Sequence, residues 1–133
     1  MKLYRSILLD QDEDINTNNI GNSWTLCEIF AENHAKDING DLKKDGFVVL
    51  QADVNEDQID WSNTLNAMEN RGYEFEVVIR GNIKATVLMV EGIDFDEYAV
   101  IEGNAGDNTF EDYYDNYDGE LTKEDLLLLS LEF

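Results

Sequence analysis

The 133-residue chain contains no proline, a single cysteine, and only nine lysines and arginines. Without proline, its turns must be formed by its nine glycines and its Asn and Asp residues. The lone Cys27 excludes an intramolecular disulfide, which favours a reducing compartment. No apolar run approaches membrane-spanning length, and residues 1–5 lack the apolar stretch of a signal peptide. These absences predict a cytoplasmic protein that does not enter a membrane.

The scarcity of basic residues leaves a large excess of negative charge. Thirty acidic side chains against nine basic ones give a formal net charge of -21. Such a surface repels nucleic-acid phosphates and anionic lipids and attracts basic partners. We therefore expect a basic protein as partner and no direct contact with nucleic acid.

Length and hydrophobic content predict one folded domain over residues 1–133, with an acidic C-terminal extension from about residue 91. Strands outnumber helices and do not alternate regularly with them, which predicts an α+β fold. The expected strands are 3–9, 47–54, 73–79, 83–90 and, more weakly, 97–102, with a hairpin turn at 80–82. The expected helices are 26–35, a short one within 55–68, and 122–133.

Two segments carry features that predict their local structure. Thr25 followed by Glu28 has the spacing of a capping box, which predicts that a helix opens there. In segment 73–79 residues alternate, so Glu74 and Glu76 are expected on one face of a strand.

Three short motifs follow one another along the chain. They are Leu3-Tyr4-Arg5-Ser6 on the first strand, Gly21-Asn22-Ser23-Trp24-Thr25 before the first helix, and Tyr73-Glu74-Phe75-Glu76 on a later strand. In this order they resemble the arginine–serine–glutamate class of ADP-ribosyltransferases, small phage and bacterial members in particular. That class carries a Tyr-Arg-small motif, a Ser-x-Ser/Thr motif (often Ser-Trp-Thr) with an alanine-rich helix, and a Glu-x-Glu. The resemblance covers residues 3–90 and implies two packed, mainly antiparallel sheets with two to three short helices.

The resemblance implies NAD as substrate and assigns catalytic roles. Glu76 would stabilise the oxocarbenium-like state of NAD cleavage and accept a bond from the ribose 2′-OH. Ser23 would hold Glu76 and the nicotinamide ribose in place. Glutamate at the position of Glu74 goes with arginine as the acceptor, so the implied activity is a protein-arginine mono-ADP-ribosyltransferase.

The same resemblance assigns residues that bind NAD. Arg5 would supply a planar fork of donors to the pyrophosphate or the nearby ribose. Ser6 is small enough for the nicotinamide amide to approach the backbone, and Ser23 and Thr25 belong to the middle motif. Either Trp24 or Phe30 would stack on nicotinamide, and the sequence does not choose between them.

Other interpretations of these residues stay open. Ser23 and Thr25 serve equally well as helix caps, and Trp24 as a core residue. A second functional class also fits the charge: a non-catalytic acidic protein that mimics DNA and blocks a host nuclease or restriction system.

Metal binding is not expected. The sole histidine, His34, has no second histidine or cysteine cluster beside it and is expected to be structural or exposed. Segment 114–125 imitates half of a calcium loop, but it begins with tyrosine and ends with aspartate, so an acidic surface loop is the better interpretation.

Overall fold

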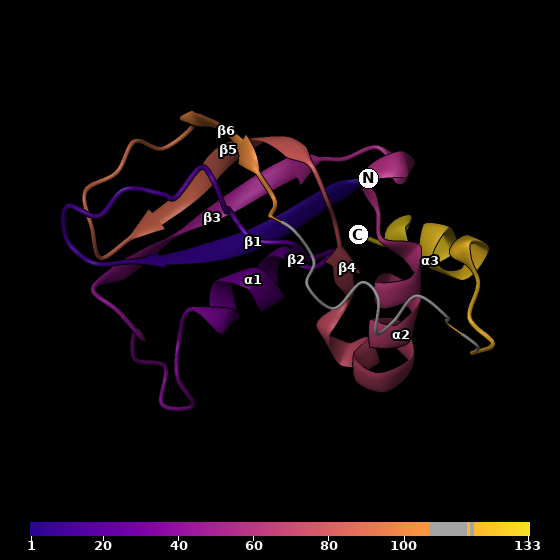
Figure 1. Cartoon of the computed structure of the whole chain (residues 1–133). Helices are drawn as coiled ribbons and strands as arrows, with labels where there is room; N and C mark the ends of the chain where they lie inside the picture. The colour runs from indigo at the N-terminus through magenta and orange to yellow at the C-terminus, as the bar shows by residue number, and fades with distance from the viewer. Residues whose placement is uncertain (107–116, 118) are drawn as a thin grey trace.

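A computed structural model describes residues 1–106, 117 and 119–133 (Figure 1). The described strands are β1 (Lys2–Leu9), β2 (Ser23–Thr25), β3 (Gly46–Asp53), β4 (Glu76–Val78), β5 (Asn82–Glu91) and β6 (Val100–Asn104). The α-helices are α1 (Glu28–His34), α2 (Trp61–Arg71) and α3 (Lys123–Ser130), and two 3-10 turns are η1 (Glu56–Gln58) and η2 (Gly72–Glu74). Within this part of the chain, no helix has the length and apolar character needed to cross a bilayer.

The strands form one antiparallel sheet in the order β4-β2-β1-β3-β5-β6. Helices and antiparallel strands in one unit confirm the predicted α+β class. The two packed sheets that the resemblance implied are replaced by one continuous, curled sheet (Figure 1). The reason is that Thr25 pairs with Tyr4 of β1 on one side and with Glu76 of β4 on the other, which joins both halves.

The junction between β1 and β2 is narrow. The β1–β3 ladder runs the full length from Lys2 to Leu9, whereas the register between β1 and β2 contains the single pair Tyr4 and Thr25. Residues of both strands at and next to this pair line the candidate site.

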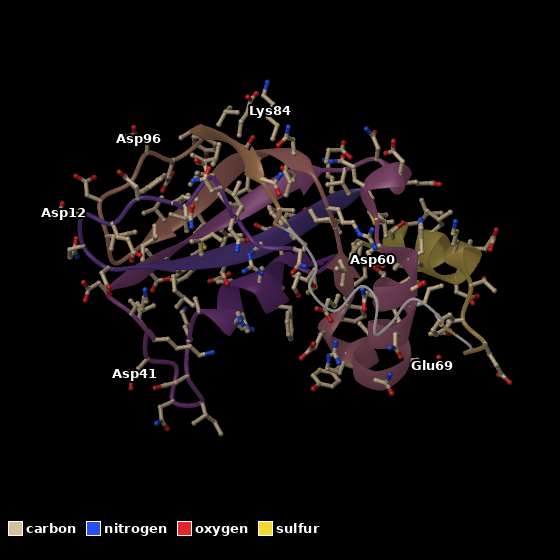
Figure 2. The ribbon with its side chains drawn as sticks, viewed as in Figure 1. Asp12, Asp41, Asp60, Glu69, Lys84 and Asp96 are labelled. Carbon is tan, nitrogen blue, oxygen red and sulfur yellow. The ribbon has the colours of Figure 1, made fainter. Side chains whose placement is uncertain are left out.

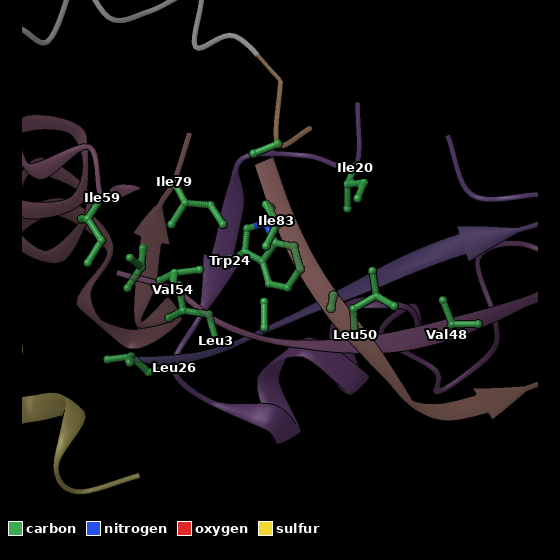
Figure 3. Packing of buried hydrophobic residues seen from close by; sticks show 14 of the residues in the cluster. Leu3, Ile20, Trp24, Leu26, Val48, Leu50, Val54, Ile59, Ile79 and Ile83 are labelled. Carbon is green, nitrogen blue, oxygen red and sulfur yellow. The ribbon is translucent and has the colours of Figure 1, made fainter. Parts of the chain in front are cut away.

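Hydrophobic residues pack on both faces of the sheet. The larger cluster surrounds the buried Trp24 and includes Leu3, Leu50 and Ile79 (Figure 3). On the opposite face, Ala31 of α1 and Ala35 pack on Phe47 and Val49 of β3. The small alanines let the short helix α1 lie close to the sheet, beside β1 and β2 (Figure 1).

The prediction that Ser23–Thr25 opens a helix is wrong, because these residues form β2 and pair with β4. Helix α1 begins later, with Cys27 as its N-cap and no side-chain capping bond. The Thr25 hydroxyl instead accepts a hydrogen bond from the Cys27 N–H at 3.1 Å and donates to the Glu74 carbonyl at 2.8 Å. Thr25 therefore ties the start of the helix to the segment that carries the glutamates.

The expected strand 73–79 is also shorter than predicted. Gly72–Glu74 forms η2, Phe75 has a left-handed backbone with φ 50, and only Glu76–Val78 forms β4. The expected hairpin at 80–82 is wrong as well, because β4 and β5 lie far apart in the strand order. Gly81, at φ 80, turns the chain away from one edge of the sheet toward β5.

The C-terminal part contributes to the fold. Strand β6 pairs with β5, and Leu126 of α3 is fully buried in the larger cluster. Thr122 caps α3 by accepting a bond from the Asp125 N–H. Most of the acidic loop 104–119, and with it positions 114–116 and 118 of the calcium-like segment, lies outside the described residues.

A buried carboxylate anchors α2, the helix that leads into the glutamate segment. Asp60 caps α2 through the Asn63 N–H at 3.2 Å, accepts a bond from the Asn63 side chain at 2.6 Å, and pairs with Arg80 at 2.7 Å. Its backbone N–H donates to Val78 of β4 at 2.8 Å. Burial raises the pKa of Asp60, but the bonds from Asn63 and Arg80 outweigh it, and the net shift is downward.

We predict that Asp60→Asn lowers the free energy of unfolding at pH 7 by about 2–3 kcal/mol, because it removes the charge that pairs with Arg80. A carboxyl whose pKa is lower in the folded state stabilises above its ordinary pKa of about 4, and that contribution is lost as pH falls through the folded value. Urea unfolding measured from pH 7 to pH 3 should therefore show that the difference in free energy of unfolding between wild type and variant becomes smaller at the acid end. A difference that does not change with pH would contradict this assignment.

Candidate functional site

A pocket of about 90 Å³ is lined by residues of β1, β2 and α1 and by two glutamates from η2 and β4. All eight residues predicted for the site line it, and they come from five elements of the fold. They are Arg5 and Ser6 from β1, Ser23, Trp24 and Thr25 from β2, Phe30 from α1, Glu74 from η2 and Glu76 from β4. The fold thus brings together residues as distant in the sequence as Arg5 and Glu76.

Glu76 is held at both of its carboxylate oxygens. The Ser23 hydroxyl donates to Oε1 at 2.5 Å, and Nη2 of Arg71 donates to Oε2 at 2.7 Å. The Glu76 side chain is 15% exposed. A carboxylate fixed in this way keeps its charge at a defined point at the edge of the pocket, which is what stabilising a developing positive charge requires.

Arg5 brings the opposite charge to the same pocket. Its Nε donates to the Ile20 carbonyl at 3.0 Å and its Nη1 to the Ser23 carbonyl at 2.6 Å, so the guanidinium is held against the loop that leads into β2. Burial lowers the pKa of Arg5, and the charge of Glu76 opposes that shift. Arginine stays protonated in proteins, so the pocket contains a fixed cation facing a fixed anion.

Gly21 makes this position of Arg5 possible. The glycine has φ +112, and a Cβ built on it would collide with the guanidinium of Arg5. Its carbonyl also accepts the indole N–H of Trp24 at 2.8 Å. The guanidinium therefore lies directly over the glycine backbone.

The polar and aromatic lining differs in part from the expectation. Trp24 is 2% exposed and its ring lies within the larger core cluster (Figure 3), so of the two aromatic residues expected to stack on a ligand only Phe30 remains a candidate. Ser6 is 7% exposed, and its hydroxyl makes no hydrogen bond with the described residues. A buried hydroxyl of this kind, in a pocket wall, suits a ligand that brings its own polar group.

Glu74 lines the pocket, but from a backbone conformation that the sequence did not indicate. Alternation along a strand is the wrong reason for its proximity to Glu76, because Glu74 lies in η2 and the left-handed Phe75 separates the two. Arg71, the last residue of α2, joins them: its Nε donates to Glu74 at 3.2 Å while its Nη2 donates to Glu76. The bond to Glu76 is the main reason that the pKa of Arg71 is raised.

Three further residues line the pocket: Tyr4, Ala31 and His34. The sequence predicts a structural or exposed His34, but the ring stacks with Phe30 at 6.3 Å between centroids. Its spacing of four from Phe30 on a helix is the signal that could have placed it on the same face. Burial lowers the pKa of His34, and the charges of Lys43 and Arg5 lower it further.

In the described residues, no three His, Cys, Asp or Glu side chains form a group that could hold a metal ion.

We predict that Gly21→Ala destabilises the protein more than Gly40→Ala does. Both glycines have positive φ, but a Cβ at Gly40 meets nothing within 4 Å. Gly40→Ala should therefore lower the free energy of unfolding only by the cost of a left-handed backbone at alanine, about 1–2 kcal/mol. Gly21→Ala should lower it by at least about 1 kcal/mol more, since Arg5 must move. Urea unfolding of both variants measures this, and equal losses would mean that Arg5 is not confined by Gly21.

Comparison of this chain with known proteins finds no similar protein. No family model matches the chain, and searches of curated proteins and of solved structures find no match either. A functional interpretation therefore depends on the residues of the pocket and on their geometry.

Proposed function

We propose that this chain is an NAD-dependent mono-ADP-ribosyltransferase that modifies arginine on a protein target. The observation that carries the proposal is the meeting of Arg5, Ser23 and Glu76 at one pocket, with Ser23 bonded to Glu76. These are the three residue types, in the same chain order, on which the resemblance to this enzyme class depends. Their strands β1, β2 and β4 are neighbours at one end of the sheet.

The chemistry that these groups support is cleavage of a glycosidic bond. In NAD, the bond between the ribose C1′ and the nicotinamide nitrogen breaks, nicotinamide leaves with the electron pair, and positive charge develops on the ribose. The fixed Glu76 carboxylate would stabilise that charge and accept the 2′-OH. Ser23 would keep the carboxylate in place through the bond to Oε1.

The shape of the pocket suits the nicotinamide end of NAD. A volume of about 90 Å³ is well below the roughly 300–1,000 Å³ of pockets that enclose a drug-sized ligand. The pocket would therefore take one ring, with Phe30 beside it and the buried Ser6 hydroxyl available to the carboxamide. The rest of the dinucleotide would extend past Arg5, whose cation compensates the pyrophosphate within an otherwise acidic protein.

The acceptor would approach over Glu74. A planar guanidinium pairs well with carboxylates, and Glu74 lies 28% exposed at the pocket edge. Attack of an acceptor nitrogen on C1′ forms the new bond, and the proton it releases passes to Glu74 and then to water. The net charge of -21 fits a basic target, since acidic loops such as those containing Asp12, Asp41 and Asp96 extend into solvent (Figure 2).

We predict that Glu76→Gln reduces nicotinamide release from NAD by about 100-fold or more, because it removes the charge that stabilises the transition state. The substitution keeps the size of the side chain but weakens its pair with Arg71, so thermal unfolding is measured beside activity to check that the variant is folded. Glu102→Gln, on exposed β6, removes the same charge far from the pocket and serves as the matched control. The measurement is nicotinamide release by the purified wild type and both variants.

The same set of variants distinguishes the acidic inhibitor from the enzyme. Inhibition spread over many surface carboxylates should respond equally weakly to Glu76→Gln and Glu102→Gln. A wild type that releases no nicotinamide and yet inhibits a DNA-binding nuclease, with both variants unchanged, would contradict the transferase proposal and support DNA mimicry.

We predict further that Glu74→Gln abolishes transfer to arginine but retains hydrolysis of NAD to nicotinamide. Glu74 would orient the acceptor and take its proton, whereas bond cleavage depends on Glu76. The check is to measure nicotinamide release and labelling of agmatine, a small guanidine acceptor, in one reaction. Equal loss of both would show that the two carboxylates do not divide the work.

A further inference from the structure

A guanidinium already lies against both glutamates. Arg71 contacts Glu74 through Nε at 3.2 Å and Glu76 through Nη2 at 2.7 Å. It comes from the C-terminal end of α2, and its side chain is 49% exposed. Two carboxylates that share one arginine form a clamp for a planar, forked cation, and such bidentate recognition is specific to guanidinium.

These contacts use the groups that catalysis would need. Oε1 of Glu76 accepts from Ser23, and Oε2, the other oxygen, accepts from Arg71. Glu74, the proposed guide for the acceptor, is engaged by the same arginine. While Arg71 is in place, an incoming guanidinium finds the Glu74–Glu76 clamp filled.

We propose that Arg71 is an internal occupant of the acceptor subsite, which the arginine of a target must displace. The inference rests on the proposed function in that the Glu74–Glu76 clamp is taken to be the acceptor site. Exchange is a replacement of like by like: one guanidinium leaves the carboxylates and another arrives, so neither carboxylate is left unpaired. Arg71 can leave because it is half exposed at a helix end, where ion pairs are weak.

The consequence is a reduced apparent affinity for the acceptor. When only a fraction of molecules has the clamp open, the measured dissociation constant rises by the inverse of that fraction. The occupant also excludes weakly bound cations, so only a target with further contacts, such as a basic surface facing the acidic protein, displaces Arg71 readily. Arg71 thereby acts on acceptor selection without touching the bond that breaks.

The test is calorimetric titration of agmatine into the full chain without NAD, at constant salt. Arg71→Ala should bind agmatine roughly three- to tenfold more tightly than wild type, which corresponds to about 0.7–1.4 kcal/mol. Arg71→Lys, which keeps the charge but not the planar fork, should fall between them. Lys84→Ala, which removes an exposed positive charge on β5, should bind like wild type. Thermal unfolding of each variant checks that the fold is intact.

A diamine of similar length, 1,4-diaminobutane, separates guanidinium recognition from simple charge. Its affinity should change less than that of agmatine on Arg71→Ala, and adding Glu74→Gln to Arg71→Ala should remove the gain. Unchanged or weaker agmatine binding by Arg71→Ala, or an equal gain for the diamine, would overturn the proposal. Because NAD is absent, this result is independent of nicotinamide release. If Arg71→Ala binds agmatine more tightly but the wild type does not cleave NAD, the guanidinium clamp would be supported and the transferase proposal contradicted.

Discussion

Strand β2 has three residues, and the candidate site is assembled through it. Thr25 pairs with β1 and with β4, the Ser23 hydroxyl bonds Glu76, and the Ser23 carbonyl accepts from Arg5. Removing this strand would separate the arginine from the glutamate, since β1 and β4 have no direct pairing in the sheet. The pocket therefore depends on a short strand held almost entirely by long-range contacts.

The candidate site contains arginines, although the chain as a whole is strongly acidic. Arg5 lines the pocket over Gly21, and Arg71 contacts Glu74 and Glu76 from the end of α2. Surface charges are screened within about 10 Å at 0.1 M salt, so a partly buried cation sets the local potential more than distant loops do. The two arginines balance the charges of Glu74 and Glu76, so the site does not share the large negative excess of the chain as a whole.

Motif order predicted the site better than local patterns predicted its elements. The motifs and the first helix led to eight of the eleven residues that line the pocket, because that inference used the types and order of residues and did not depend on the backbone conformation of each segment. Local rules failed at Ser23–Thr25, where a capping pattern competed with pairing to β4, a partner some fifty residues away. They failed again at Glu74, where strand alternation could not reveal η2 or the left-handed Phe75. The contact of Arg71 with both glutamates could not be predicted from the sequence, since only the fold brings the end of α2 to them.

The Ser-Trp-Thr sequence shows why a motif can be misjudged locally and still mark the site. On a strand, successive side chains point to opposite faces. Trp24 is thus buried in the core and fixes the strand through its indole bond to Gly21, while Ser23 and Thr25 on the other face bond Glu76 and the Glu74 carbonyl. The core interpretation of Trp24 and the site interpretation of Ser23 are therefore not alternatives. The large buried ring holds the backbone still, and that rigidity is what lets two small hydroxyls hold the glutamate segment in place.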